Sequence, residues 1–154
     1  MNEFYKKNII SVRNLDKQKL ELIFDATDKI IDMSQDKRRE IARGKTLGYL
    51  FFEPSTRTRL SFESAIALLG GTSLGIADAT SSSIHKGETL GDTIKVISSY
   101  CDVLVLRHSL DGSSRFAAEI SNKPVINAGS GTEEHPTQTI QDLYTIKKEK
   151  KKID

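Results

Sequence analysis

The sequence that decides the fold is TLGYLFFEPSTRTRLSFESAIALLGG, residues 46–71. Its first seven residues are mostly apolar or aromatic, and this composition predicts a buried strand over 46–52. Further on, a helix is expected over 60–69, because one of its faces gathers Leu60, Ser64, Ala67 and Leu68 and two glycines follow it. A polar segment joins the strand to the helix, and this order of elements is typical of an α/β fold.

Strand and helix keep alternating along the rest of the chain. Before this stretch, apolar residues recur at three- and four-residue spacing after Asp16, a good N-cap, and predict a helix over 17–33. After it, we expect strands at 72–77, 102–106 and 124–127, a loop at 79–87, and helices at 88–100, 113–121 and 136–148. The sequence therefore predicts a three-layer α/β domain, with a central parallel sheet and helices on both faces.

Length and composition narrow the class of protein. The chain has 154 residues, which suits one domain, and its 37% hydrophobic and 29% charged residues are ordinary for a globular protein. Neither a membrane-spanning apolar run nor a secretory signal is recognisable in the sequence. The single cysteine, Cys101, lies in an apolar stretch and reads as a buried small hydrophobe. We therefore expect a cytoplasmic protein without a membrane partner.

Charge is nearly balanced except at the end of the chain. With 23 basic and 21 acidic residues the net charge is +2, but residues 147–152 hold five lysines and one glutamate. Lysines suit the C-terminus of a helix, where they meet the negative end of its dipole. We prefer this interpretation to an arm that binds nucleic acid, so no nucleic-acid partner is expected.

Four polar clusters each follow a predicted strand, at residues 55–59, 81–86, 107–108 and 135–138. In parallel sheets ligands bind beyond the carboxyl ends of the strands, so these clusters are expected to form one composite site. The three histidines (His85, His108 and His135) lack the short spacing of a zinc helix, and one cysteine supplies no thiolate pair. The sequence therefore predicts no metal site.

The first cluster has the chemistry of an anion site. Ser55, Thr56, Arg57 and Thr58 precede a helix, whose unpaired N–H groups favour phosphate, and Arg57 can offer a planar fork to phosphate oxygens. The alternative is that the hydroxyls only cap the helix and the arginines pair with Glu53 and Glu63. Arg59 falls further into the helix and suits this structural role.

The clusters resemble the motifs of aspartate carbamoyltransferases. The segment FEPSTRTR, followed by Ser61-Phe62-Glu63, is similar to their carbamoyl-phosphate signature. Three further segments occur in the same order, namely Ser82 to Lys86 with Gly87-Glu88-Thr89, then Leu106-Arg107-His108, then His135-Pro136-Thr137-Gln138. The resemblance covers the whole chain but only about half of a family member. It implies a carbamoyl-phosphate-binding domain at residues 1–150, with 151–154 starting the connection to a missing aspartate-binding domain.

The resemblance also implies a role for each matching residue. Ser55, Thr56, Arg57 and Thr58 would hold the phosphate, and Arg107 would bridge the phosphate and the carbonyl oxygen. Thr58 and His135 would reach the same carbonyl, and Gln138 would accept a hydrogen bond from the carbamoyl NH2 group. The expected catalytic set is thus Thr58, Arg107, His135 and Gln138, without a cofactor. His108 is read as a packing or capping residue.

By the same resemblance, the full-length protein would transfer the carbamoyl group to L-aspartate, giving N-carbamoyl-L-aspartate and phosphate in de novo pyrimidine biosynthesis. Two alternatives stay open: half of an ornithine carbamoyltransferase, or an inactive phosphate-binding module when this chain stands alone. The family implies a homotrimer in which Ser82 and Lys86 serve the neighbouring site, and a regulatory chain is a further partner left open. Glu53 is expected to have lost a partner in the missing domain.

Overall fold

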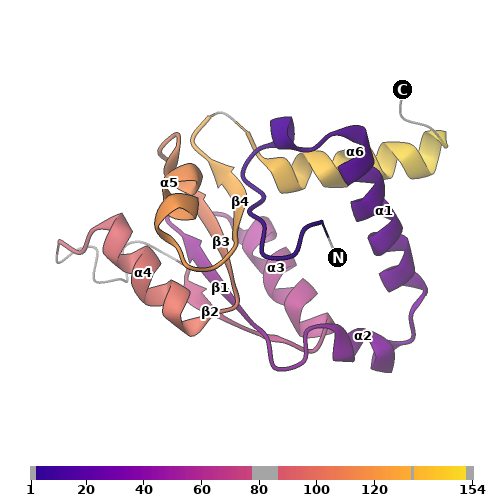
Figure 1. Cartoon of the computed structure of the whole chain (residues 1–154), viewed down its shortest axis with the longest axis horizontal. Coiled ribbons are helices and arrows are strands. Elements are labelled where there is room, and N and C mark those ends of the chain that lie inside the picture. The colour runs from indigo at the N-terminus through magenta and orange to yellow at the C-terminus, as the bar shows by residue number, and fades with distance from the viewer. Residues whose placement is uncertain (1–2, 78–86, 133, 152–154) are drawn as a thin grey trace.

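The computed structural model describes residues 3–77, 87–132 and 134–151. Its centre is a sheet of four parallel strands in the order β2-β1-β3-β4 (Figure 1). The strands are β1 (Thr46–Phe51), β2 (Thr72–Ile76), β3 (Val103–His108) and β4 (Val125–Ser130). The helices are η1 (Val12–Asn14), α1 (Lys17–Asp32), α2 (Gln35–Ile41), α3 (Thr56–Leu68), α4 (Leu90–Tyr100), α5 (Ser113–Ile120) and α6 (Pro136–Lys150).

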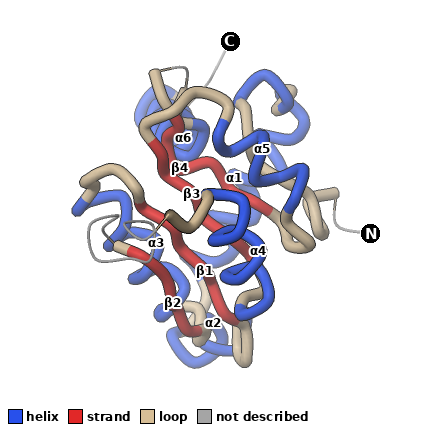
Figure 2. The backbone as a smooth tube through the Cα atoms, turned by 90° about the vertical axis from the view of Figure 1, so that its left-hand side faces the viewer, coloured by secondary structure: helices blue, strands red, loops and turns tan. Residues whose placement is uncertain are grey.

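Helices cover both faces of the sheet, as the sequence predicts. Figure 2 shows α4 and α5 over one face and α3 over the other, where α2 and α6 also lie. Neighbouring strand residues alternate between the two layers: Leu50 and Leu104 pack in one core with Ile94, whereas Phe51 and Val105 pack in the second. The three-layer α/β prediction is confirmed.

The boundaries differ from the predicted ones mainly beside the polar clusters. Helix α3 begins at Thr56, four residues earlier than expected, because Ser55 is the last residue with extended φ (−154°). The strands β3 and β4 run on to His108 and Ser130, so they include residues that were assigned to loops. Asp16 caps α1 by accepting a hydrogen bond from the Lys19 amide, as predicted. The predicted 79–87 loop falls almost entirely outside the described residues.

Two short helices, η1 and α2, were not predicted, and neither was the N-terminal arm, which is formed by residues 3–11 before η1. The arm lies beside β4, where Ile9 forms a parallel bridge with Ile126. The Ile9 amide donates to the Val125 carbonyl, and the Asn127 amide donates to the Ile9 carbonyl, both at 2.8 Å. Too few residues take part for a strand pattern to be visible in the sequence.

Three of the lysines near the end of the chain, Lys147, Lys148 and Lys150, belong to the last turn of α6, as expected for a helix C-terminus. Two of them also pair with α1: Lys147 with Glu21, and Lys148 with Asp28 at 2.6 Å. Tyr144 donates to the same Asp28 carboxylate at 2.5 Å. Hydrogen bonds from Lys148 and then from Tyr144 lower the pKa of Asp28 below its usual range. These lysines therefore join two helices.

Cys101 is buried, as predicted, and burial raises the pKa of its thiol. Within the described part of the chain, no helix is both long and apolar enough to cross a membrane.

Candidate functional site

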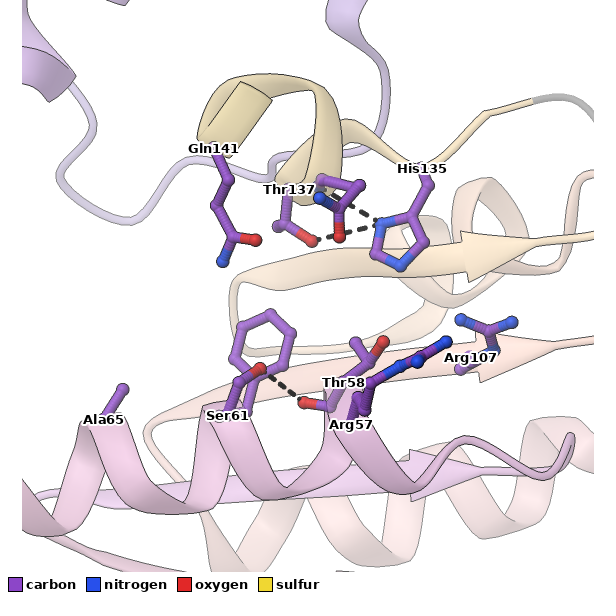
Figure 3. A pocket seen from close by; sticks show the side chains of 10 residues that line it. Arg57, Thr58, Ser61, Ala65, Arg107, His135, Thr137 and Gln141 are labelled. Atoms are coloured by element: carbon purple, nitrogen blue, oxygen red, sulfur yellow. Dashed lines mark hydrogen bonds between the residues drawn. The ribbon is translucent and has the colours of Figure 1, made fainter. Parts of the chain in front are cut away.

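The candidate site lies where the strand order reverses, at the carboxyl ends of β1 and β3. From β1 the chain passes through α3 to β2 on one side, whereas β3 and β4 lie on the other side. This is the position at which open parallel sheets bind ligands. A cavity of about 480 Å³ opens there and is lined by Arg57, Thr58, Ser61, Phe62, Ala65, Arg107, His135, Thr137, Gln138 and Gln141 (Figure 3).

The first turn of α3 forms one wall of this cavity. The N–H groups of Thr56, Arg57 and Thr58 precede the first intrahelical hydrogen bond, and Ser55 makes no side-chain cap to them. Arg57 makes no ion pair with any residue in the described ranges. Unpaired helix-terminal donors beside a free guanidinium favour a phosphate-like anion.

Arg107 lies in β3 beside this turn and already faces one carboxylate. Its Nη2 is 3.4 Å from Glu53 Oε1, and its Nη1 donates to the Ala128 carbonyl at 3.4 Å. Glu53 therefore has a partner within this domain, the side chain of Arg107, while its loss of a further partner in the missing domain stays a prediction. Both contacts are long, and the side chains of Arg107 and Glu53 keep 21% and 39% of their exposure, so the pair is weak.

His135 faces Arg107 and Thr58 from the start of α6 (Figure 3). Its Nδ1 accepts from the Gln138 amide at 3.3 Å, so the imidazole caps the helix and the neutral ring carries its proton on Nε2. Burial, and then the nearby Arg107 charge, lower the pKa of His135. The ring is thus a neutral hydrogen-bond donor at pH 7, which suits a carbonyl contact better than general-base catalysis.

Two donors in this cavity are buried without a partner. They are Arg107 Nε and His135 Nε2, the only buried side-chain N or O atoms in the described ranges that make no hydrogen bond. Leaving a buried donor unsatisfied costs about 1–3 kcal/mol each. Such a cost is expected where a ligand supplies the acceptor, and the pair would suit one oxygen or two neighbouring oxygens.

Gln138 presents an acceptor to the same cavity. Its Nε2 donates to Asp142 Oδ1 at 2.9 Å, and this contact assigns the amide group so that Oε1 stays available to accept a hydrogen bond. The neighbouring Thr137 hydroxyl lies 3.3 Å from His135 Nδ1. The site therefore offers cationic, neutral donor and neutral acceptor groups together.

The structure brings Arg57, Thr58, Arg107, His135 and Gln138 together as the sequence predicts, while the side chains of Ser55 and Thr56 lie outside the cavity lining. Ser82 and Lys86 lie outside the described residues. Sequence reasoning gave Ser61 and Thr137 only as parts of motifs, without a role in the site, and missed Gln141. Helical spacing could have revealed Ser61 and Gln141, since Ser61 follows Thr58, and Gln141 follows Gln138, by three residues.

Two residues have the structural roles that were expected. Arg59 Nη1 pairs with Glu63 Oε1 at 2.8 Å within α3. His108 Nδ1 accepts from the Leu110 amide at 3.0 Å, and its ring packs against Phe52. Burial lowers the pKa of His108. Neither side chain lines the cavity.

The model of the aspartate/ornithine carbamoyltransferase carbamoyl-P binding domain family matches residues 7–148. The chain belongs to this family. Of its relatives, the aspartate carbamoyltransferase catalytic subunit of Nitrosopumilus maritimus is 72% identical over 154 residues, which are 100% of this chain and 50% of that protein. The same subunit of Cenarchaeum symbiosum is 66% identical with the same coverage.

Solved structures of the carbamoyltransferase family have the same fold. The catalytic subunit of M. jannaschii aspartate transcarbamoylase superposes with a TM-score of 0.89 at 47% identity, over 96% of this chain and 49% of that chain. The Trypanosoma cruzi enzyme in complex with carbamoyl phosphate and aspartate gives 0.85 at 37% identity, over 97% and 49%. This family member spans about half the length of the relatives it matches.

Proposed function

We propose that this chain is the carbamoyl-phosphate-binding half of an aspartate carbamoyltransferase catalytic chain. The observation that carries the proposal is the pair of buried, unpaired donors, Arg107 Nε and His135 Nε2, beside the free N–H groups of α3. A phosphate at the first turn of α3 would place an attached carbonyl near both donors. The Trypanosoma cruzi relative has been solved in complex with carbamoyl phosphate and aspartate.

The donors suit the charge that develops during carbamoyl transfer. When an amine attacks the carbonyl carbon, negative charge builds on its oxygen, and the Thr58 hydroxyl, Arg107 and His135 Nε2 are the groups that would stabilise it. One such preorganised donor is typically worth about 3–4 kcal/mol of transition-state stabilisation. The departing phosphate takes the bonding electrons and is stabilised by Arg57, Arg107 and the α3 amides. As the tetrahedral intermediate collapses, the amine proton passes to an oxygen of the departing phosphate, which leaves as hydrogen phosphate, and no covalent enzyme intermediate is needed.

Gln138 distinguishes a carbamoyl group from plain phosphate. Its Oε1 is an acceptor, held by the Nε2 contact to Asp142, and a carbamoyl NH2 group is a donor. Inorganic phosphate has no NH2 group that could donate to Gln138 Oε1. Gln138 thus gives selectivity for the carbamoyl group, while Arg57 gives affinity for phosphate in general.

In the complete protein, the acceptor of the carbamoyl group is proposed to be L-aspartate, and the product N-carbamoyl-L-aspartate. The names of its relatives support aspartate over ornithine. The isolated chain is expected to bind carbamoyl phosphate but not to catalyse carbamoyl transfer, because its cavity offers few groups that could bind the two carboxylates of L-aspartate. The boundary near residue 150, between the carbamoyl-phosphate-binding domain and the connection to an aspartate-binding domain, remains a prediction.

We also propose that the complete protein is a cytoplasmic homotrimer in which Ser82 and Lys86 complete a neighbouring site. A lysine would add a point charge for phosphate there. Gel filtration of the full-length protein should give the mass of a trimer, and a monomer alone would contradict this assembly. Binding of a regulatory chain stays an open prediction.

Calorimetric titration of this chain with carbamoyl phosphate tests the proposal, followed by an assay for carbamoyl-aspartate after aspartate is added. Binding without product is the expected result. Product formation by this chain alone would overturn the role given to the missing half, and an absence of both would overturn the proposed site.

Two substitutions assign the roles within the site. Arg57→Ala should abolish phosphate binding and leave the fold intact, whereas the control Arg59→Ala removes the same charge two residues away and should retain binding. Gln138→Ala should weaken carbamoyl phosphate and spare phosphate. Equal losses for both ligands would remove the basis for the Gln138 assignment.

A further inference from the structure

A buried amide network lies directly behind the site. Asn127 in β4 is 3% exposed and does not line the cavity. Its Oδ1 accepts from the Gly129 amide at 2.9 Å and from Ser130 Oγ at 3.1 Å, while its Nδ2 donates to the Ile10 carbonyl at 2.9 Å. One side chain therefore joins the N-terminal arm to the end of β4.

The network surrounds an irregularity in the sheet. Leu106 pairs with Asn127 and His108 pairs with Ser130, so one residue of β3, Arg107, lies opposite two residues of β4. The two residues of β4 that oppose Arg107 are Ala128 and Gly129, and they form a β-bulge. Gly129 has φ +105°, a conformation that favours glycine. Asn127 spans this bulge, because it accepts from the backbone of Gly129 two residues on.

The bulge lies against the two side chains that carry the unpaired donors of the site. A Cβ atom added to Gly129 would lie 3.1 Å from His135 Cδ2 and 3.3 Å from Arg107 Nη1. Both side chains therefore lie close to the backbone of Gly129, where a Cβ atom would crowd them. Arg107 Nη1 also donates to the Ala128 carbonyl, the other residue of the bulge. A shift of this backbone would change the separation and aim of both side chains together.

We infer that Asn127 is a positioning residue for carbamoyl recognition: by fixing the Gly129 bulge, its amide sets the spacing between Arg107 and His135. The inference rests on the proposed function. Only a carboxamide can serve both sides of the network, since it accepts from Gly129 and Ser130 and donates to the arm. A carboxylate at this position would meet the Ile10 carbonyl with an acceptor, and an alkyl group would leave the Gly129 amide without its acceptor.

The inference predicts a selective effect on ligand binding. Asn127→Ala releases the bulge, and we expect the affinity for carbamoyl phosphate to fall about tenfold, the equivalent of one lost hydrogen bond to a charged or oriented donor. Phosphate affinity should fall by a smaller factor, about threefold or less, because of the groups proposed to hold phosphate only Arg107 depends on the bulge, whereas Arg57 and the α3 amides do not. Asn127→Asp keeps the acceptor to Gly129 and should fall between Asn127→Ala and the wild type.

Ser130→Ala is the matched control. It removes a hydroxyl from the same buried network, including its hydrogen bond with Ser114, and leaves the Asn127–Gly129 contact in place. Both variants should unfold at lower temperature than the wild type. Titrations with carbamoyl phosphate and with inorganic phosphate, made well below both unfolding temperatures, should show a changed ratio of affinities for Asn127→Ala and the wild-type ratio for Ser130→Ala.

A readout without ligand separates this inference from the proposed function. In the ¹H–¹⁵N spectrum of the histidine rings, Asn127→Ala should shift the His135 resonances, since a Cβ atom on Gly129 would lie only 3.1 Å from Cδ2 of that ring, and Ser130→Ala should not. Unchanged His135 resonances in a folded Asn127→Ala variant, or an unchanged affinity ratio, would overturn the positioning role. If Asn127→Ala fails to fold, the His135 resonances and the ratio of affinities of Asn127→Asp are compared with those of the wild type instead, and unchanged values would overturn the positioning role. Failure of the wild-type chain to bind carbamoyl phosphate would instead count against the proposed function.

Discussion

Replacement of Glu53 by glutamine should strengthen anion binding by this chain. Glu53 holds the one carboxylate that contacts Arg107 among the described residues, with 3.4 Å between Oε1 and Nη2. An incoming phosphate must compete with this carboxylate for the same guanidinium. Glutamine keeps the size of the side chain and removes its charge, so Arg107 becomes free to turn toward the ligand.

The expected gain follows from the geometry of the pair. Two unit charges at 3.4 Å attract by about 5 kcal/mol at an effective dielectric constant of about 20. Water reduces this strongly, because Glu53 retains 39% of its side-chain exposure and the contact is long for a hydrogen bond. About 1 kcal/mol is a reasonable net value for such a pair, which corresponds to roughly fivefold tighter phosphate binding.

Calorimetric titration with inorganic phosphate at low salt measures this effect. Glu63→Gln is the matched control, since it removes the same charge from α3 but frees Arg59, which lies outside the cavity. The gain from Glu53→Gln should exceed that of the control and should shrink as salt is added. Weaker binding after Glu53→Gln would refute the reasoning, because it would mean that Glu53 holds Arg107 in its binding orientation.

His135 should titrate below an ordinary histidine in an NMR pH titration, because burial and Arg107 disfavour its charged form. Its unfolded form then binds protons more readily, so the stability it contributes is complete above its unfolded pKa of about 6.5 and is lost as pH falls through the lower folded pKa. A His135 pKa above that of an unfolded chain would contradict this sign. In the core, Ile94→Ala should cost about 2–5 kcal/mol in urea denaturation, since Ile94 is fully buried. The control Val96→Ala, on the exposed side of α4 at 45% exposure, should change stability by less than about 1 kcal/mol, and similar losses for both would argue against the assigned core.

The sequence was a good guide wherever a single element carries the information. The sequence pattern located α1 and α4–α6 to within about two residues at most ends, and for α1 it did so through the regular spacing of its apolar residues. Short apolar runs located β1, β3 and β4, which are the strands with buried residues. The start of α3 was missed because Thr56 and Arg57 have no apolar face, and their helical conformation depends on the end of β1.

Contacts between distant segments could not be predicted. The order of motifs indicated that Arg107 and His135 share a site, but no local pattern shows that Glu53 reaches Arg107 across 54 positions. The bulge at Gly129 is equally hidden, since it arises from the register between β3 and β4. In both cases the sheet, and not the neighbouring sequence, decides which groups meet.

The pairing of the N-terminal arm with β4 has a consequence for how the protein is made. Asn8 and Ile10 are synthesised before their partners, which lie 117 positions later, so these hydrogen bonds can form only once β4 has been made. Until then, residues 8–10 have no strand to join, and the Val12 amide has no Glu134 carboxylate to donate to. During translation the cavity would therefore take shape only after β4 and the start of α6 have been made, and the proposed ligand could bind only from that point.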